Sequence, residues 1–126
     1  MKTLIITLSF LLINIQTKAQ EVLTGPHGGR IKITQGYRIE SVGCDNYLEI
    51  YLFNEASEPI FNNGISGEVK LFYEGKILSA PLVKYGIDGF TGKIISPDFS
   101  HYEITMNLLD KIIISASFNE CVVPKQ

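Results

Sequence analysis

Apolar and polar positions alternate along most of the chain beyond residue 20, in short segments that are separated by turn residues. Alternation with a period of two is typical of strands that bury one face. In residues 47–54, for example, Leu48, Ile50 and Leu52 share one face of such a strand. The other segments with strand character are residues 30–34, 37–42, 67–73, 76–81, 89–94, 102–108 and 112–118.

Turn signals lie between these segments at regular spacing. Gln35-Gly36 and Glu74-Gly75 predict two-residue hairpins, because glycine supplies the positive φ that such turns need. Tight turns are also expected at Gly86-Ile87-Asp88 and at Asp110, and residues 55–66 form the longest predicted loop. No segment shows helical periodicity. The sequence therefore predicts an all-β fold, an antiparallel sandwich of seven or eight strands.

One local pattern favours an immunoglobulin-like topology for this sandwich. Asp98 precedes Tyr102 by four residues, at the expected start of the penultimate strand. This arrangement resembles the tyrosine corner of Greek-key sandwiches. The alternative interpretation is that Tyr102 is an ordinary core aromatic residue.

The first 19 residues have the features of a signal peptide. Lys2 provides a basic start, an apolar stretch runs from Leu4 to Ile15, and small residues occupy positions 17 and 19. The apolar stretch is too short to span a bilayer core of roughly 30 Å. We therefore expect residues 20–126 to form one domain that is periplasmic or secreted and has no stable membrane anchor.

The charge balance narrows the classes of partner. The chain has 11 basic and 13 acidic side chains, and removal of Lys2 and Lys18 leaves a net charge of 9 − 13 = −4. Nucleic acids and anionic membranes select proteins with an excess of Lys and Arg. The mature chain is predicted to bind neither of them.

Cys44 and Cys121 are the two cysteines of the sequence. In an oxidising compartment an even number of cysteines favours a disulfide, which would stabilise the fold by roughly 4 kcal/mol for so long a loop. The alternative is a pair of thiolates that bind a soft metal ion, which requires both cysteines to stay reduced after export.

A candidate metal ligand lies in the segment Gly25-Pro26-His27-Gly28-Gly29. Glycine allows close approach and proline fixes one backbone dihedral, so the His27 imidazole is expected on a shaped loop. Imidazole suits copper and zinc. The alternative is that His27 makes a side-chain hydrogen bond that holds the amino-terminal segment against the sandwich.

Other candidate donors are few. Strand alternation places His101 on the face opposite Met106, so these two should not share an ion, and Met106 is expected to fill the core. Glu40, Asp45 and Glu49 are expected at solvated positions, as charged side chains usually are.

Several segments together resemble a family of small exported β-sandwich proteins that accompany heavy-metal efflux systems. The segments are Gly25 to Gly29, Tyr37 to Glu40, Leu48 to Leu52, Pro59-Ile60, Gly64 to Leu71 and Gly89-Phe90. Similar segments occur near the start of periplasmic efflux adaptor proteins. The resemblance implies a role with copper, silver, zinc, cobalt or cadmium ions, His27 as the ligand that lies inside the matching motif, and an efflux adaptor as a partner.

Two functions of different classes follow. Motifs of hydrolases, zinc proteases and phosphate-binding loops are missing from the sequence, so no enzyme is expected. The first hypothesis is an exported accessory protein of metal efflux that binds a transition metal ion weakly or docks on an adaptor. The second is an interaction module that binds no metal, with Tyr47, Tyr51 and Phe53 as its contact patch if they face outwards.

Overall fold

The computed structural model describes residues 23–43, 46–94 and 99–119. The predicted signal peptide and both cysteines lie outside these residues. Nine strands occur in the described residues, together with the short 3₁₀ helix η1 (Leu109–Lys111). The strands are β1 (Arg30–Thr34), β2 (Tyr37–Val42), β3 (Tyr47–Phe53), β4 (Ser66–Tyr73), β5 (Lys76–Pro81), β6 (Val83–Tyr85), β7 (Gly89–Lys93), β8 (His101–Asn107) and β9 (Ile113–Phe118).

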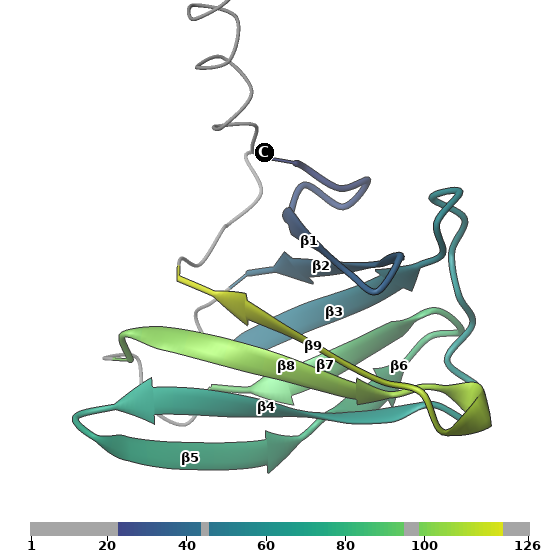
Figure 1. Ribbon diagram of the computed structural model, residues 1–126. Helices are drawn as coiled ribbons and strands as arrows, with labels where there is room; N and C mark the ends of the chain where they lie inside the picture. The colour runs from purple at the N-terminus through teal and green to yellow at the C-terminus, as the bar shows by residue number, and fades with distance from the viewer. Residues whose placement is uncertain (1–22, 44–45, 95–98, 120–126) are drawn as a thin grey trace, which may run out of the picture.

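The strands form two antiparallel sheets, which confirms the predicted all-β class. One sheet has five strands in the order β1-β2-β3-β7-β6, and the other has four in the order β5-β4-β8-β9. Figure 1 shows the four-stranded sheet as one layer, with β1, β2 and β3 in the other. No helix in the described residues is long and apolar enough to cross a membrane.

The predicted number of seven or eight strands is wrong, because the described residues contain nine. The additional strand is β6, which has three residues, all of them exposed. A strand with no buried position shows no alternation, so the sequence pattern does not reveal it. The other eight strands occur where the pattern predicts them, and their bounds agree with the predicted ones or differ by one residue.

The core lies between the two sheets and consists of the inward residues of both. In β3, Leu48, Ile50 and Leu52 are buried, as the alternation predicts. The four-stranded sheet contributes the buried side chains of Val69, Leu71, Tyr102, Ile104, Met106, Ile114 and Phe118. Met106 is fully buried, so the prediction that it fills the core is confirmed.

Tyr102 connects the two sheets through its hydroxyl group. The hydroxyls of Tyr102 in β8 and Ser41 in β2 lie 2.7 Å apart, and both residues are buried. The ring of Tyr102 also stacks on Phe118, with centroids 5.2 Å apart. The Tyr102 hydroxyl is thus hydrogen-bonded across the sandwich. Asp98, the other residue of the predicted tyrosine corner, lies outside the described residues.

Two hairpins close as the sequence predicts. Gln35 and Gly36 have φ values of 51° and 85°, and Glu74 and Gly75 have values of 46° and 75°. Two successive residues with positive φ match the right-handed twist of the flanking strands. These turns fix the register of β1 with β2 and of β4 with β5.

The chain passes from one sheet to the other at Leu82. β5 ends at Pro81, which lies opposite Glu68 of β4, and β6 begins at Val83, which lies opposite Thr91 of β7. The Leu82 amide donates to the carbonyl of Gly67, 2.9 Å away. The crossing therefore separates Pro81 from the five-stranded sheet and opens a hollow beside β7.

Candidate functional site

The loop that contains His27 closes on itself before β1. The amide of Gly25 donates to the Gly29 carbonyl over 2.9 Å, and the amide of Gly28 donates to the Gly25 carbonyl over 3.0 Å. Gly28 has a φ of 81°, which side chains rarely allow. The motif thus forms a compact turn, as its glycines and proline predict.

The turn is attached to the sheet by the carboxylate of Glu40 in β2. One oxygen accepts the backbone amides of His27 and Gly29, both at 2.9 Å, and the other lies 2.8 Å from His27 Nδ1. Glu40 is 0% exposed, so the expectation that it is solvated is wrong. The carboxylate can be buried because two amide donors and a ring nitrogen replace its water.

The position of His27 agrees with the alternative interpretation of this residue. Its side chain is 35% exposed and is bonded to Glu40, so it holds the amino-terminal segment against the sandwich. The imidazole also stacks on the ring of Tyr51, with centroids 3.6 Å apart and planes 6° apart. With Nδ1 next to Glu40, Nε2 is the remaining ring nitrogen, and no described residue forms a hydrogen bond with it.

Tyr51 and Phe53 lie on the outer face of the five-stranded sheet, beneath this loop. They are 7% and 4% exposed and form a small apolar cluster with Val42. Their expected role in an exposed contact patch is therefore wrong, because the loop covers them. Tyr47, on the same face of β3 but beyond the loop, is 62% exposed and retains that role as a candidate.

Gly89 makes room for the ring of Tyr51 on the neighbouring strand. The two residues are paired between β3 and β7, and a Cβ atom on Gly89 would lie 3.0 Å from the Tyr51 ring. The hydroxyl of Tyr51 donates to Glu49 Oε2 over 3.1 Å. Tyr51 is thus held between the loop, the strand β7 and a carboxylate.

Burial raises the pKa of Tyr51 above the ordinary value of about 10, and its hydrogen bond to Glu49 acts in the same direction. Burial also raises the pKa of Tyr102. The folded state therefore holds these protons more tightly than the unfolded state. Their contribution to stability is complete below pH about 10 and is lost as the pH rises through the folded-state pKa.

We expect the free energy of unfolding to fall above pH about 10 and to fall less steeply in Tyr51→Phe. Urea unfolding measured from pH 7 to pH 11.5 checks this. Tyr47→Phe is the matched control, because it removes the hydroxyl of a tyrosine that is exposed on the same strand. Identical slopes in wild type and Tyr51→Phe would contradict the expectation.

The other candidate donors are not brought together with His27. His101 is partly exposed and stacks on Phe72, while Met106 faces the core, so the predicted separation of the two is confirmed. Asp45, Cys44 and Cys121 lie outside the described residues. Among the residues that are described, no group of three or more His, Cys, Asp or Glu side chains is placed to hold a metal ion.

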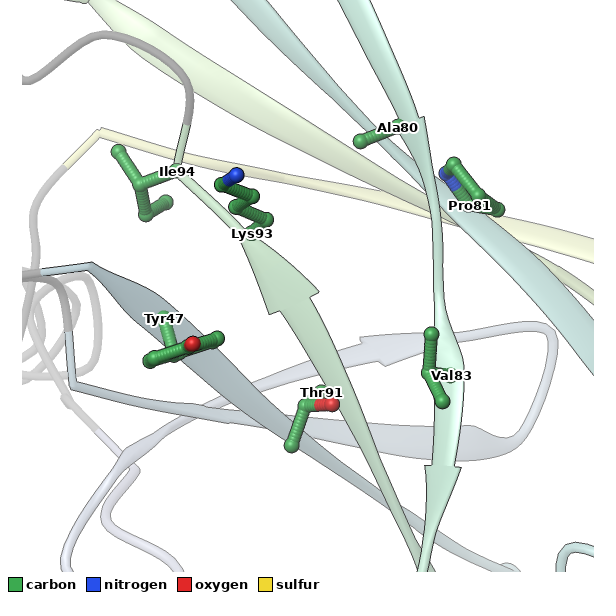
Figure 2. A pocket seen from close by; sticks show the side chains of 7 residues that line it. All are labelled: Tyr47, Ala80, Pro81, Val83, Thr91, Lys93 and Ile94. Carbon is green, nitrogen blue, oxygen red and sulfur yellow. The ribbon is translucent and has the colours of Figure 1, made fainter.

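A second candidate site is the hollow beside β7, with a volume of about 620 Å³. It is lined by Tyr47, Ala80, Pro81, Val83, Thr91, Lys93 and Ile94. Figure 2 shows Lys93 and Thr91 on a strand between that of Tyr47 and the segment from Ala80 to Val83. The strand β7 and the segment from Ala80 to Val83 lie close together at Thr91 and Val83, and they diverge toward Lys93 and Pro81.

The pattern of apolar and polar residues gives no indication of this hollow. Of its lining residues, Tyr47 was the one expected at a contact surface. The position of β6 at the sheet edge, with Val83 62% exposed, follows from the crossing at Leu82. The exposed apolar residues of the segment 83–87, which are Val83, Tyr85 and Ile87, are a signal that could have indicated an accessible surface.

Comparison of the chain with protein-family models, with curated proteins and with solved structures gives no match. The resemblance to proteins of heavy-metal efflux thus gains no support from these comparisons.

Proposed function

We propose that the protein is an exported immunoglobulin-like module that recognises a protein partner at the hollow beside β7. The exposed Tyr47 ring in this hollow is the observation that carries the proposal. Tyrosine is enriched at interfaces because its ring offers a large contact area and its hydroxyl a hydrogen bond. The surrounding Val83, Pro81 and Lys93 combine apolar contact with one positive charge.

The order of the strands supports the immunoglobulin-like topology. Immunoglobulin sandwiches contain the orders A-B-E-D in one sheet and C-F-G in the other. If β2 is taken as strand A, β2-β3-β7-β6 corresponds to the first order and β4-β8-β9 to the second. β1 and β5 are then additional edge strands. Such sandwiches serve many functions, so the fold alone does not identify the partner.

Site-specific photocrosslinking in cells of the source organism tests the proposal. A benzophenone side chain at position 47 should yield an adduct with one protein, and the adduct should be lost in Val83→Glu. The control places the same group at Ile113, which is similarly exposed on β9. Absence of an adduct from position 47, or equal adducts from both positions, would contradict the proposal.

A second candidate function is weak binding of a transition metal ion by His27, in an accessory protein of metal efflux that docks on an adaptor. The observation that favours it is the bond between His27 Nδ1 and the buried Glu40. Histidines that bind metals commonly donate their other ring nitrogen to a carboxylate, which fixes the tautomer and the direction of the ring. Copper, silver or zinc ions would be bound at Nε2.

His27 supplies one donor. Among the described residues, no three His, Cys, Asp or Glu side chains lie close enough together to hold a metal ion. Ligands from an adaptor would have to complete the coordination, so we expect weak binding by the protein alone. Competition titration of the mature protein with Cu(I), Ag(I) and Zn(II) tests this role. Binding that is lost in His27→Ala supports it, and binding lost only in the Cys44→Ser/Cys121→Ser variant assigns the ion to the cysteines.

A further inference from the structure

The direction of the backbone groups along β7 shows what the hollow offers to a partner. The amide of Ile94 donates to the carbonyl of Asn46 over 2.9 Å, on the side of β3. Neighbouring residues of a strand direct their N–H and C=O groups to opposite sides. The N–H and C=O of Lys93 therefore face away from β3 and toward the hollow, as those of Thr91 face β6.

No strand pairs with Lys93 on that side in the described part of the chain. The pairing of β6 with β7 ends at Val83 opposite Thr91. If the pairing continued, Pro81 would lie opposite Lys93, but Pro81 belongs to the four-stranded sheet, where it lies opposite Glu68. The hollow thus has, along one wall, a short unpaired length of β-strand backbone.

The side chains around this backbone are mostly apolar, with the hydroxyl group of Thr91 and the positive charge of Lys93 among them. Tyr47 lies opposite Lys93 on β3, and Val83 lies opposite Thr91 on β6. Lys93 is an exposed residue, and its ammonium group forms no ion pair with any of the described residues. Lys84, the central residue of β6, is also exposed. Lys93 and Lys84 thus place positive charge beside the hollow, whereas the whole chain has a net charge of −2.

We infer that the hollow binds an extended, acidic segment of a partner protein, which pairs its backbone with Lys93. A strand added to an unpaired edge gains main-chain hydrogen bonds, and its alternate side chains give specificity. An acidic side chain of the segment would meet Lys93, and an apolar one would pack between Tyr47 and Val83. The inference rests on the proposed function, for which it names the chemistry of the partner.

A second copy of the chain fits this edge less well than an acidic segment. In a symmetric antiparallel pair centred on Lys93, the Lys93 side chain of one copy would lie opposite that of the other. Like charges directly opposite each other destabilise a pair of strands. The charges at this edge thus favour a partner of the opposite sign.

Selection from a random dodecapeptide library against the mature protein tests the inference. We expect the recovered peptides to be enriched in Asp and Glu and to lose at least tenfold in affinity for Lys93→Glu. Lys32→Glu is the matched control, because Lys32 is exposed on the distant edge strand β1 and its replacement changes the net charge equally. In NMR spectra, a recovered peptide should slow hydrogen exchange of the Lys93 amide.

Two results overturn the inference. One is the recovery of no peptides, or of peptides without acidic enrichment. The other is an equal loss of affinity in Lys93→Glu and Lys32→Glu, which would reflect net charge alone. If position 47 still gives a photocrosslinked partner in either case, the proposed function stands and the acidic segment is wrong. If position 47 gives no adduct, the proposed function itself fails.

Discussion

Replacement of Glu40 by alanine is expected to lower the free energy of unfolding by about 3 kcal/mol. The carboxylate is the common acceptor for the amides of His27 and Gly29 and the partner of His27 Nδ1. Its removal leaves two backbone donors without an acceptor and opens a void beneath the turn. Each buried donor without a partner costs about 1–3 kcal/mol. Urea unfolding at neutral pH measures the loss.

Glu68→Ala is the matched control for this change. The side chain of Glu68 on β4 is 44% exposed, and its carboxylate lies 3.6 Å from Lys70 Nζ. Surface ion pairs contribute about 0–1 kcal/mol, so the control should change stability little. Glu40→Gln keeps the shape and one acceptor oxygen and should cost less than Glu40→Ala. Equal stabilities of Glu40→Ala and Glu68→Ala would show that the carboxylate does not hold the turn.

Replacement of Tyr51 by alanine is expected to cost about 3–4 kcal/mol of stability. The ring is buried, stacks on His27 and packs over Gly89, so its removal leaves a cavity between the turn and the sheet. The measurement is again urea unfolding. Because the turn loses its support, the amides of Gly28 and Gly29 should also exchange hydrogen faster, which NMR can follow.

Tyr47→Ala provides the matched control, with the same substitution on the same strand and the same face. Tyr47 is 62% exposed, so the loss of stability should stay within about 0.5 kcal/mol. The comparison of Tyr51→Ala with Tyr47→Ala distinguishes a structural residue from an exposed contact residue on the outer face of the sheet. A large loss for Tyr47→Ala would contradict this division, because Tyr47 would then be a structural residue rather than a free contact.

Together these expectations assign the two sites different roles. The turn with His27 belongs to the fold, since Glu40 and Tyr51 attach it to the sheet. The hollow beside β7 has an exposed ring and, as far as residues 23–43, 46–94 and 99–119 show, backbone groups and a charge without a partner. The proposed recognition therefore belongs to the hollow, and any binding of a metal ion would use Nε2 of His27, the ring nitrogen that does not contact Glu40.

Residue patterns predicted the strands because burial in a sheet repeats every second residue. Leu48, Ile50 and Leu52 face the core for this reason, and Met106 and His101 take opposite faces by the same rule. The hairpin turns were also predictable, because Gly36 and Gly75 supply positive φ values. The shape of the turn around His27 follows from its glycines in the same way.

The pattern failed where a residue depends on a distant segment. Glu40 has the sequence signature of a solvated position, but it lies under a turn that precedes it by 11 to 13 residues. Tyr51 and Phe53 face away from the core, which is the orientation that the predicted contact patch requires. The same turn covers them, however, so they are buried. Alternation tells which face a residue takes and contains no information about what covers that face.

The sequence by itself determined the all-β class, eight of the nine strands in the described residues, the tight turns and the inward face of the strands with clear alternation, such as β3. These features depend on local periodicity and on backbone angles of single residues. The tertiary structure alone decided the burial of Glu40, the stacking of His27 on Tyr51 and the hollow beside β7. Each of these features depends on contacts between segments that are distant in the chain. The order of the strands in the sheets and the crossing at Leu82 determine these contacts.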